Sequence, residues 1–308
     1  MKDNMVNHLL NGVLPVFAIG ALGFILGKRE VFDFKMAMAL NKFVMFIAMP
    51  ALTFQLLISA QLEVFNFVLL GGYLATELIM YAAGFLTARL IFKIDVIESA
   101  LLALAITLTN HILFVLPIAI TLFGEVAVMP MVAIISMDGL LIFSGSLILM
   151  DILASKSAKA SYTIVKILRN PPLIGISLGL LSGLLGVSPP KGFRLFVDFL
   201  GDTASPVLLF ALGIILSQKS AYSRPMLAVI LTGIKLVIHP LLALVILGGV
   251  LQLSPELRNP GVMIAAAPCG VMAFMLAMNY GVPVDTIARA ILFSSVGSIV
   301  TVTLAASL

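Results

Sequence analysis

The chain has 308 residues, of which 61% are hydrophobic and only 10% are charged, whereas a typical soluble domain has about 25% charged residues. This small number of charged residues cannot cover a water-exposed surface. The composition therefore excludes an ordinary soluble protein and predicts a lipid environment. The net charge of +4 is no sign of nucleic-acid binding, because basic residues in membrane proteins concentrate in cytoplasmic loops.

Ten apolar segments follow one another, each long enough for a membrane span of about 20 residues. The first has no small-residue cleavage site after it, so we expect a helix there and not a removed signal peptide. We predict an all-α polytopic membrane protein whose ten transmembrane helices lie at about 8–27, 36–58, 65–88, 99–123, 127–150, 164–186, 194–217, 225–251, 260–281 and 286–307.

Charges in the loops predict the orientation. Thirteen basic residues fall on one side of the predicted spans and four on the other, with Lys235 inside a span. The richer side should be cytoplasmic. We therefore expect a multi-pass protein of the inner (cytoplasmic) cell membrane with both termini extracytoplasmic.

The two halves of the chain resemble each other. "PALTFQL" (50–56) returns as "PVLLFAL" (206–212), 156 positions later, and Pro15 and Pro171 have the same spacing. Five helices per half is an odd number, so the second copy enters the membrane from the opposite face, as in the inverted repeats of secondary transporters. We predict a first repeat at 1–150, a cytoplasmic linker at 151–163 and a second repeat at 164–308.

Two prolines lie near the middle of equivalent spans. Pro117 and Pro268 each remove a backbone hydrogen bond, so we predict that the fourth and ninth helices are broken at 112–117 and 266–271 and cross at the midplane. A broken helix exposes N–H groups and a positive partial charge, which suit a carboxylate. We therefore expect substrate binding at Pro117, Pro268, Cys269 and Gly270, although packing alone is the favoured interpretation of Cys269.

Several polar side chains lie at membrane depth, where a charge costs about 2.5–3.5 kcal/mol. Asp138 and Glu77 are candidate ion-coupling sites for H+ or Na+; a protonated Asp138 bonded to a neighbouring helix is the alternative. Asn110 and His111 could contact substrate or could bond carbonyls freed by the break.

Other polar residues have two interpretations each. Lys235 could form a structural ion pair with Glu77 or attract an anion. His239 precedes Pro240 and is expected to cap a kink. Ser294 and Ser295 are weaker substrate-binding candidates, because hydroxyls in membrane helices often bond their own backbone.

The sequence has no phosphate-binding GxxxxGK[ST] loop and no HExxH or paired cysteines for zinc. We therefore expect neither an ATP-driven pump nor an enzyme, and no metal or cofactor beyond a coupling ion.

Seven motifs in chain order resemble the auxin efflux carrier family, in the compact bacterial form that includes malonate transporters. They are "LNKFVMFIAMPAL" (40–52), "TNHILFVLPIAITLFGE" (109–125), "NPPLIGISLGLLSGLLG" (170–186), "GDTASPVLLFALG" (201–213), "KLVIHPLLAL" (235–244), "AAAPCGVMAFMLAMNYG" (265–281) and "ILFSSVGSIVTV" (291–302). Two residues depart from the family pattern: His111 stands where Gly or Thr is common, and Met272 where Asn is common.

The resemblance implies a fold like that of bile acid symporters and sodium/proton antiporters, with crossed fourth and ninth helices. It also implies a scaffold of helices 1, 2, 6 and 7 and a moving transport domain of helices 3–5 and 8–10. We expect a secondary transporter that moves a small organic acid anion, malonate-like or another carboxylate, by elevator-type alternating access. An uncoupled channel or facilitator is the alternative. The expected partners are the substrate and the bilayer, not nucleic acid, and a homodimer stays open.

Overall fold

The computed structural model describes residues 2–58, 66–111, 115, 119, 129–154, 164–165, 167–218 and 224–308, with the side chains of 2–13 and 16 left aside. Over these residues the chain is helical and contains no β-strand. Six of its helices are long and apolar enough to cross a membrane: Phe34–Ile58, Phe67–Ile91, Met129–Leu153, Lys191–Ser217, Pro225–Val250 and Asp285–Ala305. The prediction of an all-α polytopic membrane protein is confirmed at this level.

The helices of the first half are α1 (Lys2–Lys28), α2 (Phe34–Phe43), η1 (Val44–Ala48), α3 (Met49–Ile58), α4 (Phe67–Leu86), η3 (Thr87–Ile91), α5 (Val96–Thr107), α7 (Met129–Met137), η5 (Asp138–Phe143) and α8 (Ser144–Leu153). Those of the second half are α10 (Pro171–Leu184), α11 (Lys191–Gly201), α12 (Ala204–Ser217), α13 (Pro225–Gly233), η6 (Ile234–Ile238), α14 (His239–Ala243), η7 (Leu244–Val250), α15 (Pro255–Ala265), α16 (Met272–Asn279) and α17 (Asp285–Ala305). The η elements are π-helical turns that continue the adjoining α-helices.

Two helix pairs pack closely through glycines. On α1, a Cβ added to Gly23 would lie 2.2 Å from the carbonyl oxygen of Phe210 on α12. On α10, a Cβ at Gly179 would lie 2.7 Å from the carbonyl oxygen of Phe54 on α3. Small residues allow this backbone approach, which drives helix association where lipid removes the hydrophobic force. Gly23 and Gly179 are 156 positions apart, as are Phe54 and Phe210.

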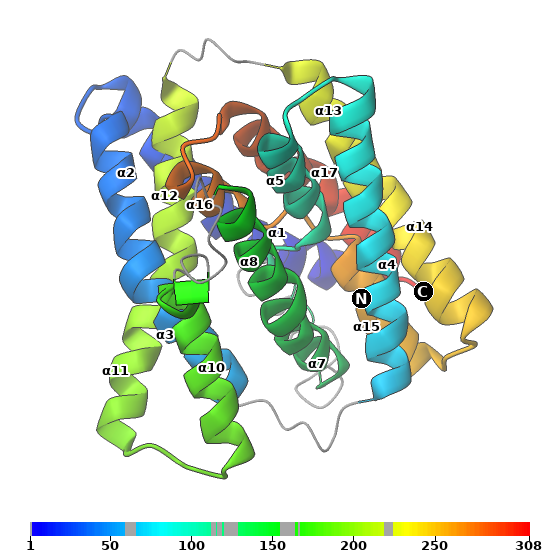
Figure 1. Cartoon of the computed structure of the whole chain (residues 1–308). Coiled ribbons are helices and arrows are strands. Elements are labelled where there is room, and N and C mark those ends of the chain that lie inside the picture. Colours follow the sequence, from blue (N-terminus) through cyan, green and yellow to red (C-terminus); the bar gives the residue numbers. More distant parts are fainter. Residues whose placement is uncertain are drawn as a thin grey trace.

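The packing divides the helices into two groups. One group holds α1, α2, α3, α10, α11 and α12, and the other holds α4, α5, α7, α8 and α13 to α17. Figure 1 shows α2, α11 and α12 at one side of the molecule and α4, α13 and α14 at the opposite side. The two groups meet where α16 touches α2, where α17 touches α1 and α12, and where α8 touches α10.

Some predicted boundaries differ from the structure. The helix α5 ends at Thr107 and Leu108 is extended (φ −64°, ψ 140°), so a break lies before 112–117; most of that predicted stretch is outside the described residues. The predicted linker at 151 begins too early, because α8 continues through Leu153. Its Asp151 is buried and accepts hydrogen bonds from Asn170 Nδ2 (3.0 Å) and Tyr280 OH (2.7 Å), so tertiary partners hold the charged residue inside a helix.

Candidate functional site

Two helix breaks meet in the interior of the molecule. The segment after α5 runs antiparallel to the segment between α15 and α16, and Thr109 pairs with Cys269. Asn110 N donates to Pro268 O (3.1 Å), and Gly270 N donates to Leu108 O (2.8 Å). Each extended segment therefore satisfies backbone groups of the other, which is how non-helical backbone can persist at membrane depth. The residue that faces Pro268 is Asn110; Pro117 lies outside the described residues.

Side chains satisfy further backbone groups at the crossing. Thr301 donates to Ala266 O (2.6 Å), Thr109 donates to Ile264 O (3.3 Å), and Ser294 accepts from Cys269 N (3.0 Å). The N–H groups of Asn110, Cys269 and Gly270 thus all have partners. By contrast, the first turn of α16 has no side-chain cap. Its N–H groups, beginning at Met272, are the ones left for a carboxylate, a little later in the chain than the prolines had indicated.

His111 and Asp138 form a buried pair beside the crossing. His111 Nε2 lies 2.8 Å from Asp138 Oδ2, and their side chains are 7% and 3% exposed. Asp138 begins the π-helical turn η5. The carboxyl group of Glu77, on α4, is also fully buried, and neither of its oxygens has a hydrogen-bond partner among the described residues. Such π-helical turns often mark functional positions in membrane helices.

Lys235 supplies a positive charge to the same region. Its side chain is completely buried on η6, and its ammonium lies 2.7 Å from Thr109 Oγ1 and 2.9 Å from His239 Nδ1. Of the two interpretations from the sequence, the direct ion pair with Glu77 does not form among the described residues, because Thr109 and His239 contact the ammonium and both Glu77 oxygens lack hydrogen-bond partners. His239 therefore orients a buried cation in addition to standing before a proline.

A narrow cavity lies between the crossing and the other helix group. Asn110, His111, Asp138 and Met272 line it, together with Thr53, Leu56 and Ser205 from α3 and α12. Its free volume is about 40 Å³, enough for a few water molecules, each of which needs about 10–15 Å³. An organic acid would need more room than this cavity offers.

The candidate residues from the sequence divide into three sets. The narrow cavity is lined by Asn110, His111 and Asp138. The crossing itself contains Pro268, Cys269 and Gly270, with Ser294 bonded to it. The buried Lys235 contacts the crossing through Thr109, and Glu77 is buried on α4. Ser295 instead lines a separate cavity against α1 and α12. Thr109 and Thr301, which bond backbone carbonyls at the crossing, were not among the candidates. A buried hydroxyl in an apolar helix has no sequence signal that separates it from an ordinary packing residue.

This helical membrane protein buries two carboxyl groups, an ammonium and a pair of broken helices. Such groups at this depth mark substrate and ion pathways, so these features indicate a membrane transporter. The chain matches the family model described as "Membrane transport protein" over residues 8–306 and therefore belongs to this family, the auxin efflux carrier family that its motifs resemble.

Two curated relatives extend over nearly the whole chain. One, from Rhizobium meliloti (strain 1021), is named "Putative malonate transporter" and is 24% identical, covering 94% of this chain and 92% of its own. The other, from Methanothermobacter thermautotrophicus, is named "Uncharacterized transporter" and is 25% identical, covering 95% of each chain. Both names indicate transport and not catalysis.

Proposed function

We propose that this protein is a secondary transporter of a small organic acid anion and works by elevator-type alternating access. The observation that carries the proposal is the crossing of Thr109–Asn110 with Pro268–Gly270. Thr109 and Asn110 also line a narrow cavity between two separately packed helix groups. The name of the relative from Rhizobium makes malonate the first substrate to test. We place the protein in the cytoplasmic membrane with both termini outside, from the distribution of its basic loops.

The packing supports a ten-helix, 5+5 inverted repeat. Gly23 on α1 packs on Phe210 of α12, and the residues 156 positions away from each, Gly179 and Phe54, also pack on each other. An internal twofold axis would produce this reciprocal pair of contacts, whereas chance similarity would not. The helix group of α1, α2, α3 and α10 to α12 would then be the scaffold, and the other group the moving domain.

The substrate carboxylate would bind at the uncapped first turn of α16, beside His111 and Asn110. The helix dipole places positive partial charge at that end, and the buried ammonium of Lys235 adds a full positive charge behind it. Asp138 opposes an anion unless His111 or a proton neutralises it. Asp138 Oδ2 lies 2.8 Å from His111 Nε2, so Asp138 orients the imidazole that faces the substrate.

The carboxyl groups of Glu77 and Asp138 provide the coupling site. Both are buried carboxyl groups at membrane depth, where an uncompensated charge is costly, so each can bind a proton that compensates its own charge. Transport coupled to protons follows if anion arrival and separation of the helix groups change the environment of this pair. A sodium ion would have to compete there with the nearby Lys235 ammonium, so we favour protons.

Proteoliposome transport of radiolabelled malonate tests the function. The expected result is saturable uptake that accelerates when unlabelled malonate is preloaded inside, because exchange returns a loaded carrier faster than an empty one. Two- to six-carbon mono- and dicarboxylates should compete to different extents. A flux that rises linearly with concentration, carries current and shows no exchange would instead make the protein a channel. The Asn110→Ala variant should lose exchange while keeping its unfolding temperature.

A further inference from the structure

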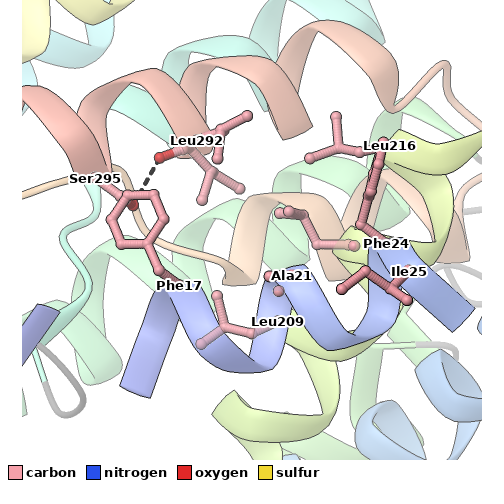
Figure 2. Close-up of a pocket in the computed structure, with 12 residues that line it drawn as sticks. Phe17, Ala21, Phe24, Ile25, Leu209, Leu216, Leu292 and Ser295 are labelled. Carbon is pink, nitrogen blue, oxygen red and sulfur yellow. Dashed lines mark hydrogen bonds between the residues drawn. The ribbon is translucent and has the colours of Figure 1, made fainter. Parts of the chain in front are cut away.

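A second, larger cavity lies away from the crossing, between α1, α12 and α17. It has a free volume of about 340 Å³, at the lower end of the range of small-molecule sites, which runs from about 300 to 1,000 Å³. Figure 2 shows Phe17, Ala21 and Phe24 of α1 facing Leu209 and Leu216 of α12 across this space, with Leu292 on the α17 side. It is therefore walled by three helices that come from both helix groups.

The cavity offers almost nothing to a polar ligand. Ser295 is its one hydroxyl-bearing lining residue, and Ser295 Oγ already donates to Ile291 O of its own helix (2.7 Å). A buried water needs two to four polar partners, so water is not a stable occupant. The lining chemistry selects a hydrocarbon, and it separates this space from the polar cavity in which the substrate is proposed to bind.

The cavity is continuous with the surface that faces lipid. Phe24, Ile25 and Leu292 line it and are also 39%, 47% and 36% exposed. In a membrane protein such apolar surface is covered by acyl chains, so an acyl chain can enter sideways from the bilayer. The occupant is thus supplied by the membrane and not by the aqueous phase.

Positive charge lies at one end of the cavity. Lys28, at the end of α1, is exposed, and its Nζ lies 5.9 Å from the centroid of the Phe24 ring that lines the cavity. Arg29 follows it and is exposed as well, with Glu30 as the next residue. Lys and Arg near a membrane surface attract anionic lipid, and Arg binds phosphate oxygens in pairs. The cations therefore stand one helical turn from the acyl-chain entrance.

We propose that this cavity is a binding site for one anionic phospholipid, with an acyl chain between α1, α12 and α17 and the phosphate at Lys28 and Arg29. The site lies where α17 of one helix group meets α1 and α12 of the other. Lipid binding here does not depend on which substrate the protein carries, so it can be tested without a transport assay.

The absence of tryptophan from the natural chain allows a direct fluorescence test in detergent. A single tryptophan in the Phe17→Trp variant reports from inside the cavity. Leu90→Trp, at a position 66% exposed on η3, reports from the general lipid-facing surface. Phosphatidylglycerol with brominated acyl chains should quench the Phe17→Trp emission in a saturable way, at about one lipid per protein, and the Leu90→Trp emission only linearly. Equal quenching at both positions would overturn the site.

Two further variants separate the acyl chain from the headgroup. A Cβ at Gly20 meets only Leu209 O, at 3.9 Å, so Gly20→Leu fills the cavity without displacing backbone and should abolish saturable quenching. Ala21→Leu is the second filling variant if the first one fails to fold, as judged by its unfolding temperature. Lys28→Ala with Arg29→Ala should raise the lipid concentration for half-quenching at least tenfold and remove the preference over brominated phosphatidylcholine. All of these variants are made in the Phe17→Trp protein, which supplies the fluorescence signal. Unchanged quenching in the filled variants, or indifference to headgroup charge when Lys28 and Arg29 are intact, would contradict the proposal.

Discussion

His111 Nε2 and Asp138 Oδ2 lie 2.8 Å apart, one on the extended segment after α5 and the other at the start of a π-helical turn. Both side chains are buried, so each group compensates the cost of burying the other. The family-atypical histidine is therefore paired with the candidate coupling carboxylate, and it lines the same narrow cavity as Met272, the second atypical residue.

This pair should be energetically coupled. We expect His111→Ala and Asp138→Asn each to lower the unfolding temperature, and the double variant to lower it by less than the two changes added together. Contacting residues typically show interaction energies of about 0.5–3 kcal/mol in such a cycle. Ser136→Ala is the control partner, since Ser136 is buried near Asp138 but bonds its own helix at Val132 O. Strict additivity of His111→Ala with Asp138→Asn would show that the pair is not coupled.

Lys235 should set the affinity for an anion. Lys235→Met removes the buried ammonium and leaves Thr109 and His239 without their shared donor. We expect KM for malonate exchange to rise at least tenfold, a loss of about 1.4 kcal/mol. The KM of Lys235→Arg should lie between those of the natural protein and Lys235→Met, because arginine keeps the charge but not the compact geometry of an ammonium. The exposed Lys42→Met is the matched control and should leave KM unchanged; a normal KM in Lys235→Met would remove Lys235 from the substrate site.

The two glycine contacts predict a symmetric effect on stability. Gly23→Ala and Gly179→Ala would each push a methyl group against backbone, at 2.2 Å from Phe210 O and 2.7 Å from Phe54 O. Overpacking of this kind costs about 1–3 kcal/mol, so both variants should unfold at lower temperature. Gly71→Ala is the control, because a Cβ there meets nothing within 4 Å and alanine favours a helix by about 1 kcal/mol. If only one of the two variants is destabilised, the helix pairs are not equivalent.

The Asp151–Asn170 hydrogen bond should hold the two helix groups together at one end. Asp151 ends α8 in one group, and Asn170 precedes α10 in the other. Asn170→Asp places two carboxylates face to face, so we expect α8 and α10 to separate more often. Hydrogen exchange measured by mass spectrometry should then be faster in 144–153 and 171–184. Tyr280→Phe keeps the Asp151–Asn170 contact and should raise the exchange rate less. Equal exchange rates in the natural protein, Asn170→Asp and Tyr280→Phe would show that this contact does not restrain the helix groups.

Much of this architecture follows from local sequence. The lipid environment follows from composition, because a chain with 10% charged residues cannot cover itself for water. The break in the ninth helix at 266–271 follows from Pro268, since proline removes a hydrogen bond wherever it stands. The family is evident from seven short motifs in order. Each of these inferences depends on chain chemistry or on neighbouring residues only.

Other features were decided by contacts between distant residues. The extended backbone at Leu108 and Asn110 is held by the hydrogen bonds that these residues exchange with the opposite segment, and no proline in 108–110 marks it in the sequence. The partners of Lys235 were decided in the same way, since a buried ammonium bonds whichever acceptors the fold brings within reach. Ser295 lies on the same helix as Ser294, yet it lines an apolar cavity while its neighbour bonds Cys269. Adjacent helix positions point about 100° apart, and only the packing of α17 against its neighbours determines what each one meets.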